Sequence, residues 1–110
     1  MKIVVSGRHR AFLLRKEVMV ELGLDPCKDV PFETRSDPWL VALAEECPDA
    51  IARDGVVLEV VDFPDEATDY CITDYDSLET VVYVLDGMIF AAYGPEPEDH
   101  KRIGGCYAYV

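Results

Sequence analysis

The stretch TVVYVLDGMIFAAY, residues 80–93, carries the strongest fold signal in the chain. Two apolar runs, 80–85 and 88–93, are rich in β-branched and aromatic residues and flank the dipeptide Asp86-Gly87. Asp-Gly favours a type I′ turn, because both central residues of that turn need a positive φ, and such a turn joins two antiparallel strands. The sequence therefore predicts a β-hairpin over residues 80–93.

Further β-forming segments lie on both sides of this hairpin. Residues 2–6, 56–62 and 70–73 are rich in β-branched and aromatic side chains, so each is predicted as a strand. Residues 106–110 are predicted as a last strand that carries two tyrosines on one face. Residues 74–79, between two of the predicted strands, are expected to form a turn or a short helix.

Two helices are predicted in the N-terminal half. Apolar residues recur with helical spacing over residues 11–22, and Gly23 follows where a C-cap glycine is favoured. Asp37-Pro38 combines a favoured N-cap residue with proline at the first helical position, which predicts a second helix over residues 38–47. The buried face of this second helix is expected to consist of Trp39, Leu40, Leu43 and Ala44.

The order of these elements defines the expected fold class. Helices come early and strands late, without β-α-β alternation, so we predict an α+β fold. The fold should be a mostly antiparallel sheet of four to five strands, with both helices packed on one face. A length of 110 residues with 50% hydrophobic residues fits a single domain over residues 1–110. The chain has neither a leader-like start nor an apolar run of about 18–20 residues, so a cytoplasmic location is expected.

Charge is distributed very unevenly along the chain. The sequence holds 22 acidic and 10 basic residues, for a formal net charge of −12. Residues 54–99 contain thirteen of these acids and no lysine or arginine, yet their apolar runs predict folded strands. The acids should therefore decorate strands and turns. Direct binding of nucleic acid through phosphates is excluded, because it needs a basic face.

Metal and redox chemistry has little support in the sequence. The candidate residues are isolated cysteines and histidines, without a Cys-x-x-Cys pair: Cys27, Cys47, Cys71, Cys106, His9 and His100. Structural zinc sites bring ligands in close pairs, so no zinc site is expected, and most of the cysteines are predicted to be free thiols in a reducing compartment. Cys106, near the chain end, is the exception whose redox state stays open.

Two short charged segments allow more than one interpretation. Residues 74–79 place three carboxylates close together, either as a calcium or magnesium site or as an acidic turn, and the turn is favoured because the spacing does not match an EF-hand loop. Residues 8–10, Arg-His-Arg, either hold a phosphate or pair with acidic residues of the same fold. Neither segment predicts catalysis, so we expect no enzyme activity and no cofactor.

Five motifs follow one another within residues 1–80: Met1–Val5, Phe12 with Leu14 and Glu17, Arg35–Val41, Leu58–Asp65 and Ile72–Glu79. In this order they resemble a group of small proteins common in phage and prophage genomes. The chain departs from the group at Arg10 and Ala11, where a glycine pair usually precedes the phenylalanine, and the part after residue 86 falls outside the resemblance. The resemblance implies an origin in a mobile element and implies no particular reaction.

The acidic stretch and this resemblance together support one main hypothesis. The chain is expected to be a non-enzymatic inhibitor that occupies the nucleic-acid-binding surface of a host defence complex, as anti-CRISPR and anti-restriction proteins do. Its carboxylates would stand in for phosphates, since DNA offers one negative charge per about 1.7 Å of axis. The expected partner is therefore a basic nucleic-acid-binding protein or complex of the host. The predicted contact residues are Asp62, Asp65, Glu66, Asp69, Asp74, Asp76 and Glu79.

Two alternatives remain open. The chain is an accessory phage protein that binds another protein through shape and the tyrosine-bearing strand 106–110, with the charge serving solubility. Alternatively, it is a metal-dependent enzyme. Salt separates the first alternative from the main hypothesis, because only exposed ion pairs are screened strongly by salt.

Overall fold

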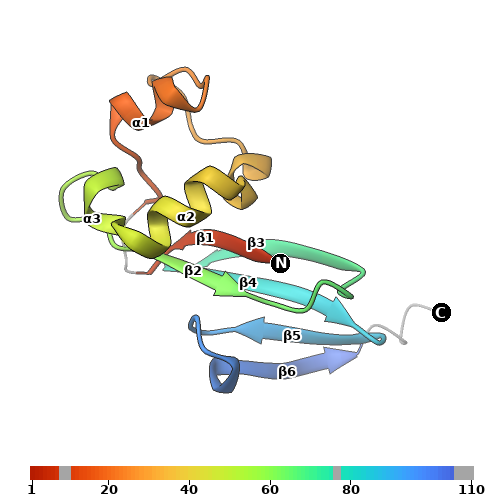
Figure 1. The fold of residues 1–110 in the computed structure, drawn as a ribbon. Coiled ribbons are helices and arrows are strands. Elements are labelled where there is room, and N and C mark those ends of the chain that lie inside the picture. The colour runs from red at the N-terminus through yellow and green to blue at the C-terminus, as the bar shows by residue number, and fades with distance from the viewer. Residues whose placement is uncertain (8–10, 76–77, 106–110) are drawn as a thin grey trace.

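A computed structural model describes residues 1–7, 11–75 and 78–105 (Figure 1). Its helical elements are α1 (Lys16–Glu21), the 3₁₀ helix η1 (Phe32–Ser36), α2 (Pro38–Glu46), α3 (Pro48–Ile51) and the 3₁₀ helix η2 (Pro97–Asp99). Its strands are β1 (Lys2–Ser6), β2 (Leu58–Asp62), β3 (Asp69–Tyr75), β4 (Leu78–Leu85), β5 (Met88–Ala92) and β6 (His100–Gly105). Among the described residues, no helix has the length and apolar character to cross a membrane.

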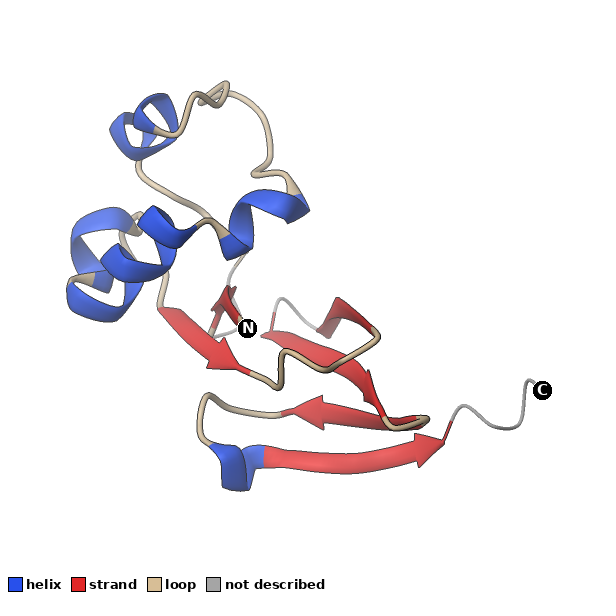
Figure 2. Ribbon diagram, turned by 45° about the vertical axis from the view of Figure 1, so that its right-hand side comes forward, coloured by secondary structure: helices blue, strands red, loops and turns tan. Residues whose placement is uncertain are grey.

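The strands form two antiparallel sheets, and helices α1, α2 and α3 gather on one side of the smaller sheet (Figure 2). Strands β1 and β2 pair with each other, while β3, β4, β5 and β6 form a four-stranded sheet in that order. One hydrophobic core joins the two-stranded sheet to the helices, and a second core joins it to the four-stranded sheet. The arrangement is an α+β fold, so the predicted fold class is confirmed.

Strand β1 lies between the two cores, which explains the apolar run Ile3–Val5 at its centre. Ile3 and Val5 contribute to the core shared with the four-stranded sheet, whereas Val4 contributes to the core shared with the helices. Successive side chains of a strand point to opposite faces, so a strand buried on both faces must be apolar at every position. The burial of all three residues, at most 2% exposed, follows from this position.

The predicted hairpin is confirmed. Strands β4 and β5 pair around Asp86-Gly87, and Leu85 is the register partner of Met88. The φ angles of Asp86 and Gly87 are 53° and 75°, as a type I′ turn requires at its two central positions.

The predicted helix over residues 11–22 is wrong in its first half, because only its second half forms α1. Leu14 is extended and forms an antiparallel bridge with Ala52. The N–H of Arg15 donates to the carbonyl oxygen of Ile51 at 2.8 Å. Hydrogen bonds with a segment nearly forty residues away thus replace the first helical turn, although the spacing of apolar residues is compatible with a helix.

The end of α1 follows the prediction. Gly23 has a φ of +75°, and its N–H donates to the carbonyl oxygen of Val20. The N–H of Leu24 donates to the carbonyl oxygen of Met19. These two bonds define a Schellman motif, in which glycine occupies the left-handed position at no steric cost.

Helix α2 also begins as predicted, but its buried face differs. The Asp37 carboxylate accepts hydrogen bonds from the N–H groups of Trp39 and Leu40, as an N-cap residue does. Trp39 was expected to be buried, but it is 44% exposed. The buried residues are Leu40, Val41 and Ala44, and at 100° per residue Trp39 points roughly 140–150° away from the centre of this stripe.

The turn or short helix predicted over residues 74–79 is wrong for residues 74, 75, 78 and 79, which belong to strands. Strand β3 extends to Tyr75 and β4 begins at Leu78, so Asp74 and Glu79 are register partners in the sheet. The edge strand β6 was not expected, since its sequence is polar and ends in two glycines. The predicted strand 106–110 lies outside the described residues.

Candidate functional site

The predicted contact residues do not form one continuous row. Asp62, Asp65, Glu66 and Asp69 lie on the end of β2, the β2–β3 connection and the start of β3. All four are exposed, and the side chains of Asp62 and Asp65 retain 61% and 83% of their accessible surface. Asp74 is exposed at the opposite end of β3. Asp76 lies outside the described residues.

The separation along β3 divides these acids into two electrostatic groups. Asp74 follows Asp69 by five residues of strand, which corresponds to about 17 Å. The Debye length at physiological ionic strength is about 8 Å, so charges this far apart in solvent act almost independently. A single negative field over all of the predicted residues is therefore not present in the described structure.

Glu79 is an internal residue, so its prediction as a partner contact is corrected. Its side chain is 9% exposed and accepts two hydrogen bonds from the Arg35 guanidinium, at 2.8 and 2.9 Å. Its Oε1 also accepts from the N–H of Ser6 at 2.7 Å. With both oxygens engaged inside the fold, this carboxylate cannot stand in for a phosphate.

Asp86 joins the exposed acids at the β2–β3 connection. The N–H of Thr68 donates to the carbonyl oxygen of Val84, and Val84 is the register partner of Asp69. The hairpin turn with exposed Asp86 follows two residues later, at the same end of the sheet. We call the exposed carboxylates of this end the acidic rim, which comprises Asp62, Asp65, Glu66, Asp69 and Asp86.

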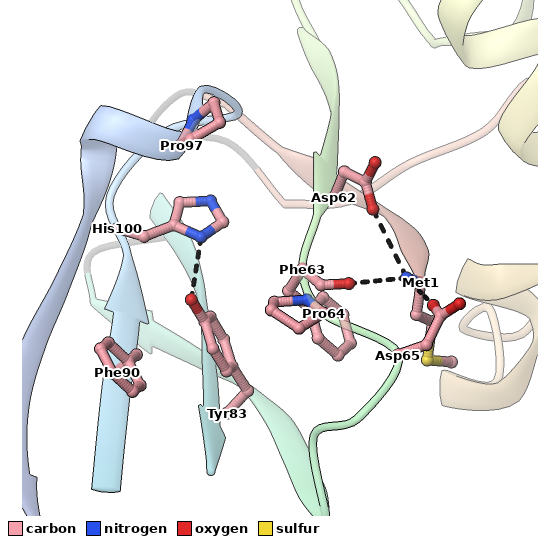
Figure 3. A pocket seen from close by; sticks show the side chains of 9 residues that line it. All are labelled: Met1, Asp62, Phe63, Pro64, Asp65, Tyr83, Phe90, Pro97 and His100. Carbon is pink, nitrogen blue, oxygen red and sulfur yellow. Dashed lines mark hydrogen bonds and ion pairs between the residues drawn. The ribbon is translucent and has the colours of Figure 1, made fainter. Parts of the chain in front are cut away.

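A pocket of about 620 Å³ opens beside the acidic rim (Figure 3). It lies between the end of β2 and the strands β4, β5 and β6, with His100 and Pro97 across from Asp62 and Asp65. The lining residues are Met1, Asp62, Phe63, Pro64, Asp65, Tyr83, Phe90, Pro97 and His100. Sequence reasoning missed this site, because its residues come from five separate segments.

Three stacked aromatic rings contribute to the lining of the pocket. The Tyr83 ring lies between those of Phe63 and Phe90, with centroid distances of 5.4 Å on each side. Burial raises the pKa of the Tyr83 hydroxyl, which therefore stays protonated at neutral pH and lies 3.0 Å from Nδ1 of His100. Nε2 of His100 is buried and has no hydrogen-bond partner within the described part of the chain.

The opposite wall of the pocket binds a cationic nitrogen. The amino group of Met1 contacts Asp65 Oδ1 and lies 3.4 Å from Asp62 Oδ1. It also donates to the carbonyl oxygen of Phe63 at 2.6 Å. Burial lowers the pKa of this amino group, but the hydrogen bonds and charges of Asp65 and Asp62 outweigh that effect, so the pKa is raised.

A second cavity, of about 240 Å³, lies between the two sheets at the far end and contains Glu59 and Glu79. Burial raises the pKa of Glu59, and the charge of Asp99 adds to the shift. Between the ordinary and the raised pKa, the carboxyl group is protonated in the folded state but ionised in the unfolded state. Above both values, ionising the group costs more free energy in the folded state than in the unfolded state. Ionised Glu59 therefore opposes folding at neutral pH.

We expect Glu59→Gln to be more stable than the wild type at pH 7. The wild type loses stability as the pH rises from the ordinary Glu59 pKa of 4.5 through the raised value, whereas glutamine does not titrate. The advantage of the variant should therefore shrink towards zero below about pH 4. Urea unfolding of both proteins across this pH range measures the difference, and a pH-independent difference would contradict the expectation.

The remaining predicted features give no additional site. No group of three or more His, Cys, Asp or Glu residues is placed to hold a metal ion among residues 1–7, 11–75 and 78–105. Cys27 and Cys71 are exposed free thiols and Cys47 is a half-buried one. The basic corner 8–10, Cys106 and the tyrosine-bearing segment 106–110 lie outside the described residues.

Comparisons with known proteins do not add a family. No protein-family model matches the chain, and neither curated proteins nor solved structures show a significant match to it. The resemblance of residues 1–80 to phage proteins therefore stays a prediction, and the function must be argued from the acidic rim and the pocket.

Proposed function

We propose that this chain is a non-enzymatic binding protein whose acidic rim docks on the basic, nucleic-acid-binding surface of a partner protein. The resemblance to phage proteins favours an inhibitor of a host defence complex, of the anti-CRISPR or anti-restriction kind. The observation that carries the proposal is the exposure of five carboxylates at one end of the fold. All five come from residues 54–99, a stretch that contains no lysine or arginine.

The acidic rim is held by the backbone rather than by its own side chains. Phe63 is buried between the sheets, and Thr68 is hydrogen-bonded to β4, so both ends of the β2–β3 connection are fixed. Preordered charges lose little conformational entropy on binding, which favours their use as phosphate surrogates. The amino group of Met1 is the one cation within salt-bridge distance of the rim in the described structure, and exposed ion pairs of this kind are weak.

The rim supplies a smaller field than the whole acidic stretch of residues 54–99. Four of the seven predicted contact residues remain in the proposal, and Asp86 is added from the hairpin turn. Complementary charge of this kind steers association, and such steering raises association rates up to roughly 10⁸–10⁹ M⁻¹s⁻¹ at low salt. The proposal therefore requires a compact basic site, such as the entrance of a groove for nucleic acid, as its target.

We expect the triple variant Glu66→Gln, Asp69→Asn, Asp86→Asn to lose at least about tenfold in partner affinity. These three rim residues do not line the pocket, so the variant tests the rim alone. Its thermal stability should equal or exceed that of the wild type, because like charges are removed. The measurement is capture from a bacterial lysate, with identification of bound proteins, elution from about 50 to 500 mM NaCl, and competition by duplex DNA.

A matched control neutralises three exposed acids on the helical side, with Glu17→Gln, Glu21→Gln and Glu46→Gln. The two variants have the same net charge, so a difference between them reports where the charge lies. The proposal is supported if the wild type and the control variant capture a DNA-binding protein and the rim variant does not. Capture that survives in the rim variant, or that resists both high salt and DNA, contradicts it.

A further inference from the structure

The pocket beside the acidic rim has hydrogen-bonding side chains on two opposite walls. Asp62 and Asp65 form one wall, and the ring of His100, whose Nε2 is buried without a hydrogen-bond partner in the described part of the chain, lies on the other (Figure 3). We infer that the pocket receives an arginine side chain of the partner protein, and this inference rests on the proposed function above. The rim attracts the basic surface, and the pocket selects one guanidinium from it.

The carboxylate wall already accepts hydrogen bonds from a nitrogen cation. The amino group of Met1 uses one oxygen of Asp62 and one of Asp65, together with the carbonyl oxygen of Phe63. Each carboxylate has about four lone-pair sites and remains largely exposed, so a second donor is accepted without displacing Met1. A guanidinium is well suited to this wall, because its rigid planar array of donors matches carboxylate oxygens.

The imidazole wall has an unmet hydrogen-bonding group. Leaving a buried polar atom without a partner is unfavourable, so Nε2 of His100 favours a ligand that supplies one. If Nδ1–H donates to the Tyr83 oxygen, Nε2 is an acceptor and a guanidinium N–H completes it. A lysine ammonium is compact, whereas the five N–H donors of arginine spread over a plane and reach towards both walls.

The apolar part of the pocket suits the stem of this side chain. Phe63, Pro64, Phe90 and Pro97 form the apolar part of the pocket lining. Arginine covers such surfaces with its methylene groups while its charged end remains hydrogen-bonded. The volume of about 620 Å³ lies within the range of roughly 300–1,000 Å³ for ligand pockets, so the backbone that flanks the arginine also has room to enter.

The inference is tested on the isolated chain by NMR titration of ¹⁵N-labelled protein. The probes are N-acetyl-arginine methylamide, the lysine analogue, and the norleucine analogue that has an uncharged stem. We expect the arginine probe to bind with a dissociation constant in the millimolar range, to shift amides of residues 62–65 and 100, and to bind at least about threefold more tightly than either other probe. Equal binding of all three, or shifts elsewhere only, overturns the inference.

Two variants with equal charge locate the binding. Asp62→Asn with Asp65→Asn should weaken binding of the arginine probe at least about fivefold. Asp69→Asn with Asp86→Asn removes the same charge from the part of the rim outside the pocket. This variant should change the affinity for the arginine probe less than about twofold. The imidazole ¹⁵N shifts of His100 should show an unprotonated Nε2 in the complex, and a protonated Nε2 contradicts the proposed contact.

These outcomes are independent of the capture experiment. The titration uses no partner, so its failure removes the arginine pocket and leaves the role of the rim intact. If the rim variant captures the partner as well as the wild type, the proposed function is wrong. Binding of the arginine probe in the titration would still show that the pocket accepts a guanidinium. Circular dichroism melts of the two double variants establish that each is folded, so that a loss of probe binding reports the site.

Discussion

Glu79→Ala is expected to lower the free energy of unfolding by about 3–5 kcal/mol, the largest effect of any single carboxylate in the described structure. The side chains of Glu79 and Arg35 are 9% and 13% exposed and form a bidentate ion pair. Removing the carboxylate leaves the guanidinium buried without its counterion. It also takes away the acceptor that Glu79 provides for the N–H of Ser6.

The ion pair joins three segments that are far apart in the sequence. Arg35 lies in η1, Glu79 in β4, and both bond to β1 through the carbonyl oxygen of Val4 and the N–H of Ser6. The guanidinium carbon also lies 3.6 Å from the centroid of the Phe12 ring. Side chains thus satisfy backbone groups of β1 that β2 does not reach, which protects this edge from pairing with another chain.

Urea unfolding followed by circular dichroism measures this effect. Asp69→Asn is the matched control, since Asp69 is exposed on the neighbouring strand and should change stability by less than about 0.5 kcal/mol. Replacing both partners, with Arg35→Met and Glu79→Met, should restore much of the loss, because no buried charge remains unpaired. A Glu79→Ala variant as stable as the Asp69 control would show that the pair is not buried in solution.

Glu79 also shows why the sequence overestimated the acidic surface. Asp74 and Glu79 are register partners on one face of the sheet, and their local sequences give no reason to treat them differently. What separates them is Arg35, which is 44 residues away from Glu79 in the chain. Only tertiary structure reveals that one carboxylate is buried in an ion pair while its neighbour is exposed.

The elements that the sequence predicted well depend on short-range chemistry. Asp86-Gly87 specifies its own turn, Asp37 caps the helix that follows it, and Gly23 ends the helix before it. In each case, the decisive hydrogen bond or φ angle involves residues within a few positions of one another. Such features can be predicted from the sequence alone, because the interactions that determine them lie within one short segment.

The pocket and the edge strand β6 could not be predicted for the opposite reason. His100 begins a polar strand whose backbone pairs with β5. Tyr83 was correctly placed in a strand, but nothing near it in the sequence indicates the contact with His100 or the stacking on Phe63. Sites assembled from several segments need the relative positions of those segments, and hydrophobic periodicity does not supply them.

Leu14→Ala is expected to destabilise the chain by about 2–5 kcal/mol, the second large effect. Leu14 has no accessible surface and contributes to the core that joins the helices to the two-stranded sheet. Its backbone pairs with Ala52, so the neighbouring chain is held in place and cannot readily collapse into the space that alanine leaves. A site that cannot relax retains its cavity and loses the most stability.

Leu13→Ala is the matched control, because the adjacent residue has the same side chain and is 36% exposed. Strand-like alternation places neighbouring side chains on opposite faces, so the two substitutions should differ by at least about 1.5 kcal/mol. Urea unfolding of both variants measures that difference. Equal losses would mean that both leucines are buried to a similar extent, which is incompatible with the extended segment that pairs with residues 51–53.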